Sequence, residues 1–107
     1  MKIILAIILS CLGLFSAHGA DPKTNWMNNC MQCHGADGSA NTPMGKAVNA
    51  KDLTKAQIQS SFTDAQATAA IKDGVTKDGM TKMSAFGGAL SDEEIKALVA
   101  YVRTLKK

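Results

Sequence analysis

Two cysteines and a histidine in one short segment are the residues of this chain best suited to chemistry. They occur in the run Cys30-Met31-Gln32-Cys33-His34, with the cysteines three residues apart and the histidine directly after them. On a helical turn, residues three and four apart project from one side, so both thiols can add to the two vinyl groups of one porphyrin. His34 is then held beneath the ring with its imidazole directed at the iron. This spacing is the attachment signature of haem c, and it predicts one haem bound covalently through two thioethers.

A pair of cysteines at this spacing also occurs in redox disulfides and in zinc sites. A redox disulfide would need a strand–helix context, which the surrounding sequence does not show. A structural zinc ion needs four ligands. After residue 19, the only cysteine or histidine ligands available are Cys30, Cys33 and His34. Both alternatives are therefore weaker than haem.

A haem iron held by one histidine needs a second axial ligand or keeps an open site. No second histidine follows residue 19, so a methionine sulfur, which raises the reduction potential, is the obvious candidate. The methionines after residue 19 are Met27, Met31, Met44, Met80 and Met83. The first two lie on the helix next to His34 and cannot readily reach the far face of the ring, and the third follows Pro43 on the His34 side. Met80 and Met83 lie in a later loop that can wrap over the haem, and spacing alone leaves these two open.

The elements that must position these residues read as helices joined by long loops. Residues 21–24 can open a first helix, because Pro22 falls in the first turn, where its missing N–H costs nothing. That helix would carry Trp26 and Cys30 on one face, four residues apart. A long turn-rich stretch with several glycines follows the motif, and a short helix is expected over 52–60.

Two capping boxes predict the remaining helices. Thr63 and Gln66 can satisfy the free N–H groups at the start of a helix that should stop at Gly74. Ser91 and Glu94 fit the same pattern at the start of the last helix. The apolar residues of that helix recur at helical spacing: Ile95, Leu98, Val99, Val102 and Leu105. No stretch alternates apolar and polar residues for long enough to predict a strand. The expected fold is therefore all-α, with about four to five helices.

The first nineteen residues are expected to be a secretory signal peptide. A positively charged start is followed by an unbroken apolar run over 3–9 and then by a small, polar tail. The small residues near the end of this segment place the cut after Gly19 and leave 20–107 as one domain. Lipidation at Cys11 is a weaker alternative, because the apolar stretch before it is unusually short. Export of this kind favours a periplasmic location.

Composition narrows the class of function further. The chain has 12 lysines and arginines against 9 aspartates and glutamates, a formal net charge of +3. There is no basic run with interleaved aromatic residues, so nucleic-acid binding is not expected. Aromatic residues make up only 5% of the chain. A small domain with so few large aromatic residues can form only a small hydrophobic core and is marginally stable on its own. A large buried cofactor would stabilise it.

The chain resembles the class I c-type cytochromes, the small monohaem cytochromes of bacterial periplasms, over essentially all of 24–105. The segments that carry the resemblance are 30–38, 42–46, 83–88, 90–95 and 101–102. By that resemblance the domain at 20–107 is a cytochrome c domain wrapped around its haem, and Met83, not Met80, is the sixth iron ligand. The carbonyl of Pro43 would accept the Nδ1–H of His34 and fix the imidazole ring. Trp26 and Tyr101 would meet where the first and last helices cross.

The resemblance also implies a function. It predicts a monomeric electron carrier that docks transiently with redox-partner proteins at its haem edge and takes no small-molecule substrate. No enzyme activity is expected, because no acid or base is placed near the distal side and a six-coordinate iron excludes substrate. The alternatives are a gas-binding or sensor module, in which carbon monoxide displaces Met83, and a weak peroxidase. The loop lysines expected at the haem rim, which could steer an acidic partner or simply be solvated, are Lys46, Lys51, Lys77 and Lys82.

Overall fold

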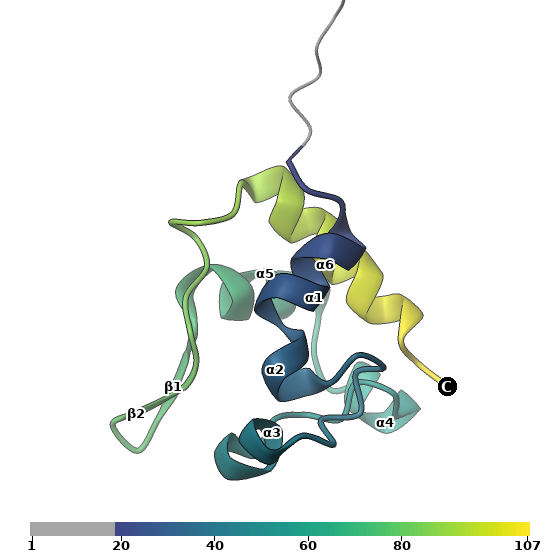
Figure 1. The fold of residues 1–107 in the computed structure, drawn as a ribbon, viewed down its shortest axis with the longest axis vertical. Helices are drawn as coiled ribbons and strands as arrows, with labels where there is room; N and C mark the ends of the chain where they lie inside the picture. Colours follow the sequence, from purple (N-terminus) through teal and green to yellow (C-terminus); the bar gives the residue numbers. More distant parts are fainter. Residues whose placement is uncertain (1–18) are drawn as a thin grey trace, which may run out of the picture.

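The segment that carries the two cysteines follows the first helix, close to where that helix crosses the last one. The computed structural model describes residues 19–107, so all but the last residue of the predicted signal peptide lies outside the described residues. Within the described part the chain forms six helices and one hairpin (Figure 1). They are α1 (Pro22–Asn29), α2 (Met31–His34), α3 (Pro43–Val48), α4 (Ala56–Gln59), α5 (Asp64–Asp73), β1 (Val75–Lys77), β2 (Met80–Met83) and α6 (Asp92–Thr104).

Helix α1 packs across α6, and this crossing supports the attachment motif (Figure 1). The Asp21 carboxylate caps α1 by accepting the Thr24 N–H at 3.0 Å, and Pro22 occupies the first turn as predicted. The buried ring of Trp26 lies 5.6 Å from that of Tyr101, measured between centroids. The expected meeting of these two residues is therefore confirmed.

Both predicted capping boxes are present, and they set the starts of α5 and α6. Thr63 accepts the Gln66 N–H with its hydroxyl, and the Gln66 amide accepts the Thr63 N–H in return. Ser91 and Glu94 make the same exchange at the start of α6. The second carboxylate oxygen of Glu94 accepts a hydrogen bond of 2.8 Å from the buried Asn25 side chain. The cap of α6 thus also fastens that helix to α1.

A β-hairpin stands where the sequence predicted no strand. Strands β1 and β2 pair antiparallel, with Val75 opposite Met83 and an irregularity directly after Val75. Asp78 and Gly79 form the turn with positive φ values of 53° and 74°. Two left-handed residues of this type suit the two-residue turn that matches the twist of paired strands. The strands are short and largely exposed, which is why their residues show no apolar alternation.

Helix α3 replaces part of the predicted turn-rich stretch. Thr42 caps it by accepting the Gly45 N–H at 2.9 Å, and Pro43 occupies its first turn. The following helix is shorter than predicted, since α4 covers only four residues of the expected 52–60. These small helices turn the chain beneath α2 and return it toward α5 (Figure 1).

The hydrophobic core lies between α1, α5 and α6. Its most fully buried large side chains are Trp26, Ile95 and Leu98. The partly buried apolar residues packed against it include Phe62, Met83 and Phe86. Among residues 19–107 no helix is both long and apolar enough to cross a membrane.

Candidate functional site

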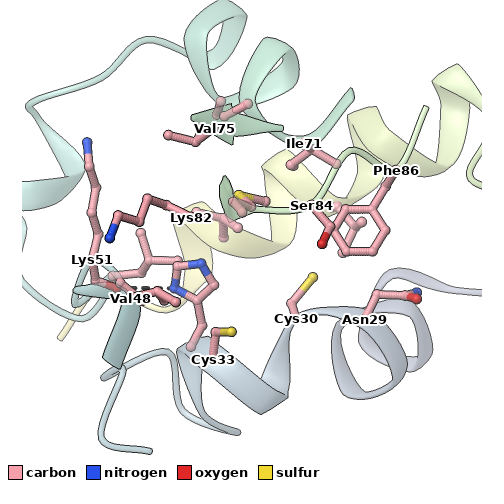
Figure 2. Close-up of a pocket in the computed structure, with 18 of the residues that line it drawn as sticks. Asn29, Cys30, Cys33, Val48, Lys51, Ile71, Val75, Lys82, Ser84 and Phe86 are labelled. Carbon is pink, nitrogen blue, oxygen red and sulfur yellow. Dashed lines mark hydrogen bonds between the residues drawn. The ribbon is translucent and has the colours of Figure 1, made fainter. Parts of the chain in front are cut away.

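A cavity of about 860 Å³ lies beside this core, and its wall includes residues of both strands and every helix except α4. Its apolar wall includes Leu53, Phe62, Ile71, Phe86 and Leu98. Cofactor sites commonly have volumes of about 300–1,000 Å³ and mostly apolar walls. The cavity therefore suits a large, mainly apolar group. Figure 2 shows part of its lining.

The attachment motif forms one side of the cavity. Cys30, Cys33 and His34 all line it, and Figure 2 shows the sulfur atoms of both cysteines on its lower side. The carbonyl of Cys30 accepts the N–H groups of Cys33 at 3.3 Å and His34 at 2.9 Å, so the motif is a helical turn. The three side chains therefore reach the same space, as their spacing predicts.

The environment of the Cys30 thiol differs from that of a reactive or metal-binding cysteine. Burial, with a smaller contribution from the neighbouring Cys33, raises the pKa of the Cys30 thiol to about 11. Reactive and metal-binding cysteines need a lowered pKa, because the thiolate is the reacting form. Within 19–107 no three cysteine, histidine, aspartate or glutamate side chains cluster closely enough to hold a metal ion.

The imidazole of His34 is oriented by a carbonyl that the sequence did not predict. Its Nδ1 lies 3.2 Å from the carbonyl oxygen of Lys51. The prediction that Pro43 accepts this hydrogen bond is therefore wrong. Pro43 is the first residue of α3, and carbonyl groups there point along the helix toward later N–H groups. Its side chain is exposed, and it is not part of the cavity wall.

This environment leaves the other ring nitrogen of His34 available as a ligand. Burial lowers the pKa of His34, and the hydrogen bond to Lys51 offsets only part of that effect. The ring is therefore neutral at pH 7, and with Nδ1 donating its proton the lone pair of Nε2 is free. Trp26 supports the same segment, because its Nε1 donates to the Gly35 carbonyl at 3.1 Å and its ring centroid lies 5.7 Å from that of His34.

The structure separates the two methionines that spacing left equivalent. Met83 lines the cavity and packs against the core. Met80 lies beside the turn of the hairpin, opposite Lys77, is 61% exposed and is not part of the cavity wall. The segment after Met83 is tied to α5, since Phe86 N–H donates to the Ile71 carbonyl at 2.8 Å. Met44 also borders the cavity, but it comes from α3 and is 45% exposed.

The four rim lysines also separate into two pairs. Lys51 and Lys82 line the cavity, whereas Lys46 and Lys77 do not. Sequence reasoning grouped all four by their position in loops. Only the folded arrangement, with β2 facing the loop that follows α3, distinguishes the first pair.

Comparison with known proteins identifies the family. The family described as cytochrome C oxidase, cbb3-type, subunit III matches residues 17–102. The chain is also 32% identical over 105 residues to cytochrome c-553 of Helicobacter pylori (strain ATCC 700392 / 26695), covering 98% of both chains. This chain is a small class I c-type cytochrome. Among solved structures the cytochrome resembles the KustC0563 c-type cytochrome, with a TM-score of 0.72, 33% identity and coverage of 82% of this chain and all of the other. A point mutant of that protein matches with a TM-score of 0.69, 32% identity and coverage of 81% and 100%.

Family membership makes the cytochrome an electron-transfer haem protein of the cytochrome c fold, with other redox proteins as its partners. The described residues fit the cofactor. A cavity of suitable size and apolar character has two thiols, a neutral imidazole and a thioether on its wall.

Proposed function

We propose that this cytochrome is a monomeric periplasmic shuttle that carries single electrons through one haem c, attached by Cys30 and Cys33 and ligated by His34 and Met83. When bound, the haem supplies an iron that cycles between two oxidation states. The observation that carries the proposal is the shared cavity. One helical turn presents both thiols and the imidazole to it, and Met83 reaches it from a different part of the chain.

The protein groups around the iron would tune electron transfer without chemistry of their own. Lys51 orients His34 through its carbonyl, and this second contact raises the basicity of the ligand. The thioether of Met83, as the second ligand, would favour the reduced iron and raise the reduction potential. If His34 and Met83 both ligated the iron, a small molecule would find no open site on it. Such a closed arrangement would favour a carrier over the gas-binding and peroxidase alternatives.

Export is part of the proposal, because the N-terminal residues have the pattern of a signal peptide and the haem is expected to be attached covalently, as in exported cytochromes of this class. The mature chain would begin at Ala20, after the cut behind Gly19, or one residue later. Intact mass of the purified protein under denaturing conditions tests both points. The expected mass is that of the mature chain plus one haem, and a Cys30→Ala/Cys33→Ala variant should lack the added mass. The mass of the bare polypeptide in the wild type would contradict the proposal.

A further inference from the structure

We propose that Lys51 and Lys82 bind the two carboxylate groups of the haem and so tie its acidic edge to both segments that carry axial ligands. The inference deepens the proposed function and rests on it, because it requires a haem in the cavity. Haem is an apolar plate with two propionate carboxylates along one edge. A cavity that holds it therefore needs cationic or hydrogen-bonding groups on one side only.

The charges on the cavity wall fit this requirement. The ionisable residues that line it are Cys30, Cys33, His34, Lys51 and Lys82. No aspartate, glutamate or arginine of the described chain joins them. Figure 2 shows Lys51 and Lys82 on the same side of the cavity, with Phe86 and Asn29 on the opposite side. Two cations beside an apolar space favour a ligand with two negative charges at one edge.

The burial of Lys82 is a second sign of an anionic ligand. Lys82 is half-buried, whereas all the other lysines of residues 19–107 are exposed. Lysine side chains are mostly exposed in folded proteins, so a half-buried lysine beside an apolar cavity is well placed to pair with an anion there. The ion pairs in this part of the chain involve Lys72, Arg103 and Lys107, not Lys82. A carboxylate of the cofactor would provide the missing partner.

Lys51 is held at the cavity in a different way. Its ammonium group lies 5.6 Å from the centre of the Phe62 ring, which also lines the cavity. Its carbonyl accepts the hydrogen bond from His34. A carboxylate bound by this side chain would therefore stabilise the backbone position that orients the histidine.

The two lysines consequently connect the cofactor to opposite axial ligands. Lys82 directly precedes Met83 at the end of β2, so an ion pair at Lys82 would hold the methionine segment over the ring. Lys51 acts on His34 through its own carbonyl. Docking of acidic proteins would then depend on the remaining exposed lysines, including Lys46 and Lys77.

The test compares Lys51→Met and Lys82→Met with Lys46→Met and Lys77→Met, which remove equal charges outside the cavity. Lys82→Arg, which keeps the charge, is the matched rescue. Each purified holoprotein is examined without a partner by redox potentiometry and by carbon monoxide titration of the ferrous form. A crystal structure of the wild-type holoprotein gives the distances from both ammonium groups to the carboxylates.

We expect both lysine nitrogens within about 4 Å of a propionate oxygen, the usual reach of an ion pair. Lys51→Met and Lys82→Met should lower the reduction potential, because an unpaired carboxylate stabilises the ferric iron. Lys82→Met should also make binding of carbon monoxide to the ferrous iron detectable, whereas the wild type should show none. Lys82→Arg, Lys46→Met and Lys77→Met should behave like the wild type.

Two results would overturn the inference while leaving the proposed function intact. One is a holoprotein structure in which both ammonium groups point away from the carboxylates. The other is a set of cavity variants whose potential and carbon monoxide affinity match those of the Lys46 and Lys77 controls but which exchange electrons more slowly with an acidic protein. The second result would assign these lysines to docking. A protein without covalent haem would instead defeat the proposed function itself.

Discussion

At the scale of single residues, the chemistry of the site depends on the surroundings of the His34 imidazole and on where the side chains of Met83 and Met80 lie. Burial lowers the pKa of His34, so the ring stays neutral and can ligate iron at physiological pH. Met83 faces the cavity, whereas Met80 is largely solvent-exposed three residues earlier. We therefore expect these two methionines to have different roles, because the backbone places one at the cavity and the other in solvent.

Met83→Ala should open the iron, whereas Met80→Ala should not. Loss of the thioether ligand predicts a high-spin or water-bound iron, a lower potential and ready binding of carbon monoxide to the reduced form. Replacing the exposed Met80 side chain should change the reduction potential only slightly. Absorption spectra and potentiometry of both variants provide the measurement. An open-site spectrum for Met80→Ala, with a normal one for Met83→Ala, would show that the ligand had been misassigned.

The residue pattern predicted the attachment motif but not the hydrogen-bond partner of its histidine. Cys30, Cys33 and His34 carry their chemistry in their side chains and their spacing, so the sequence alone is enough to propose them. The acceptor for His34 is a backbone carbonyl, which every residue possesses. Pro43 was predicted by resemblance, and the fold brings the Lys51 carbonyl to the ring instead. A carbonyl of this kind becomes visible only once the loop after α3 is placed.

At the scale of elements, the hairpin and the end of α5 position Met83. Gly74 ends α5 with φ of 77° and ψ of −179°, a backbone conformation that residues other than glycine rarely adopt. A Cβ at this position would lie 2.7 Å from the Met83 carbonyl oxygen. The close approach of the two backbones therefore fixes where β2 ends.

Gly74→Ala should weaken the binding of Met83 to iron, and Gly79→Ala is its matched control. Gly79 also has a positive φ, of 74°, but a Cβ there would meet nothing within 4 Å. The control should cost only the backbone strain, about 1–2 kcal/mol of unfolding free energy. Gly74→Ala adds a clash with backbone and should lower stability further while increasing carbon monoxide binding. Denaturant unfolding and carbon monoxide titration measure the two effects. Equal behaviour of both variants would contradict the positioning role.

The elements with side-chain caps were the ones predicted well. The boxes at Thr63 and Ser91 marked the starts of α5 and α6, because a capping hydroxyl is a local and specific signal. Helix α3 carried a similar signal, with Thr42 before Pro43, which was missed within a turn-rich stretch. The hairpin was missed because its strands are short and exposed. Only the Asp78-Gly79 pair indicated it.

For the molecule as a whole, the core and the cavity share one wall. Leu98 and Val102 of α6 belong to the core and also line the cavity. A bound haem would therefore cover apolar surface that the small core leaves open. Outside the cavity, Lys46 and Lys77 are exposed lysines, which an acidic partner would match better than a basic one.

Raising the ionic strength should slow electron exchange with an acidic redox protein. Exposed charges are screened beyond a Debye length of about 10 Å at 0.1 M salt, so steering by surface lysines should fade over this range. Stopped-flow rates across a salt series give the measurement, with an uncharged electron donor as the control. Rates with the acidic protein that do not depend on salt would indicate that Lys46 and Lys77 are simply solvated.

The central claim, that electrons pass through an iron closed by His34 and Met83, is tested most directly by absorption spectra of the wild-type protein with and without carbon monoxide. At neutral pH we expect a low-spin haem in both oxidation states and a reduced spectrum that carbon monoxide leaves unchanged. Ready formation of a carbon monoxide complex by the wild type would contradict the claim and favour a gas-binding module.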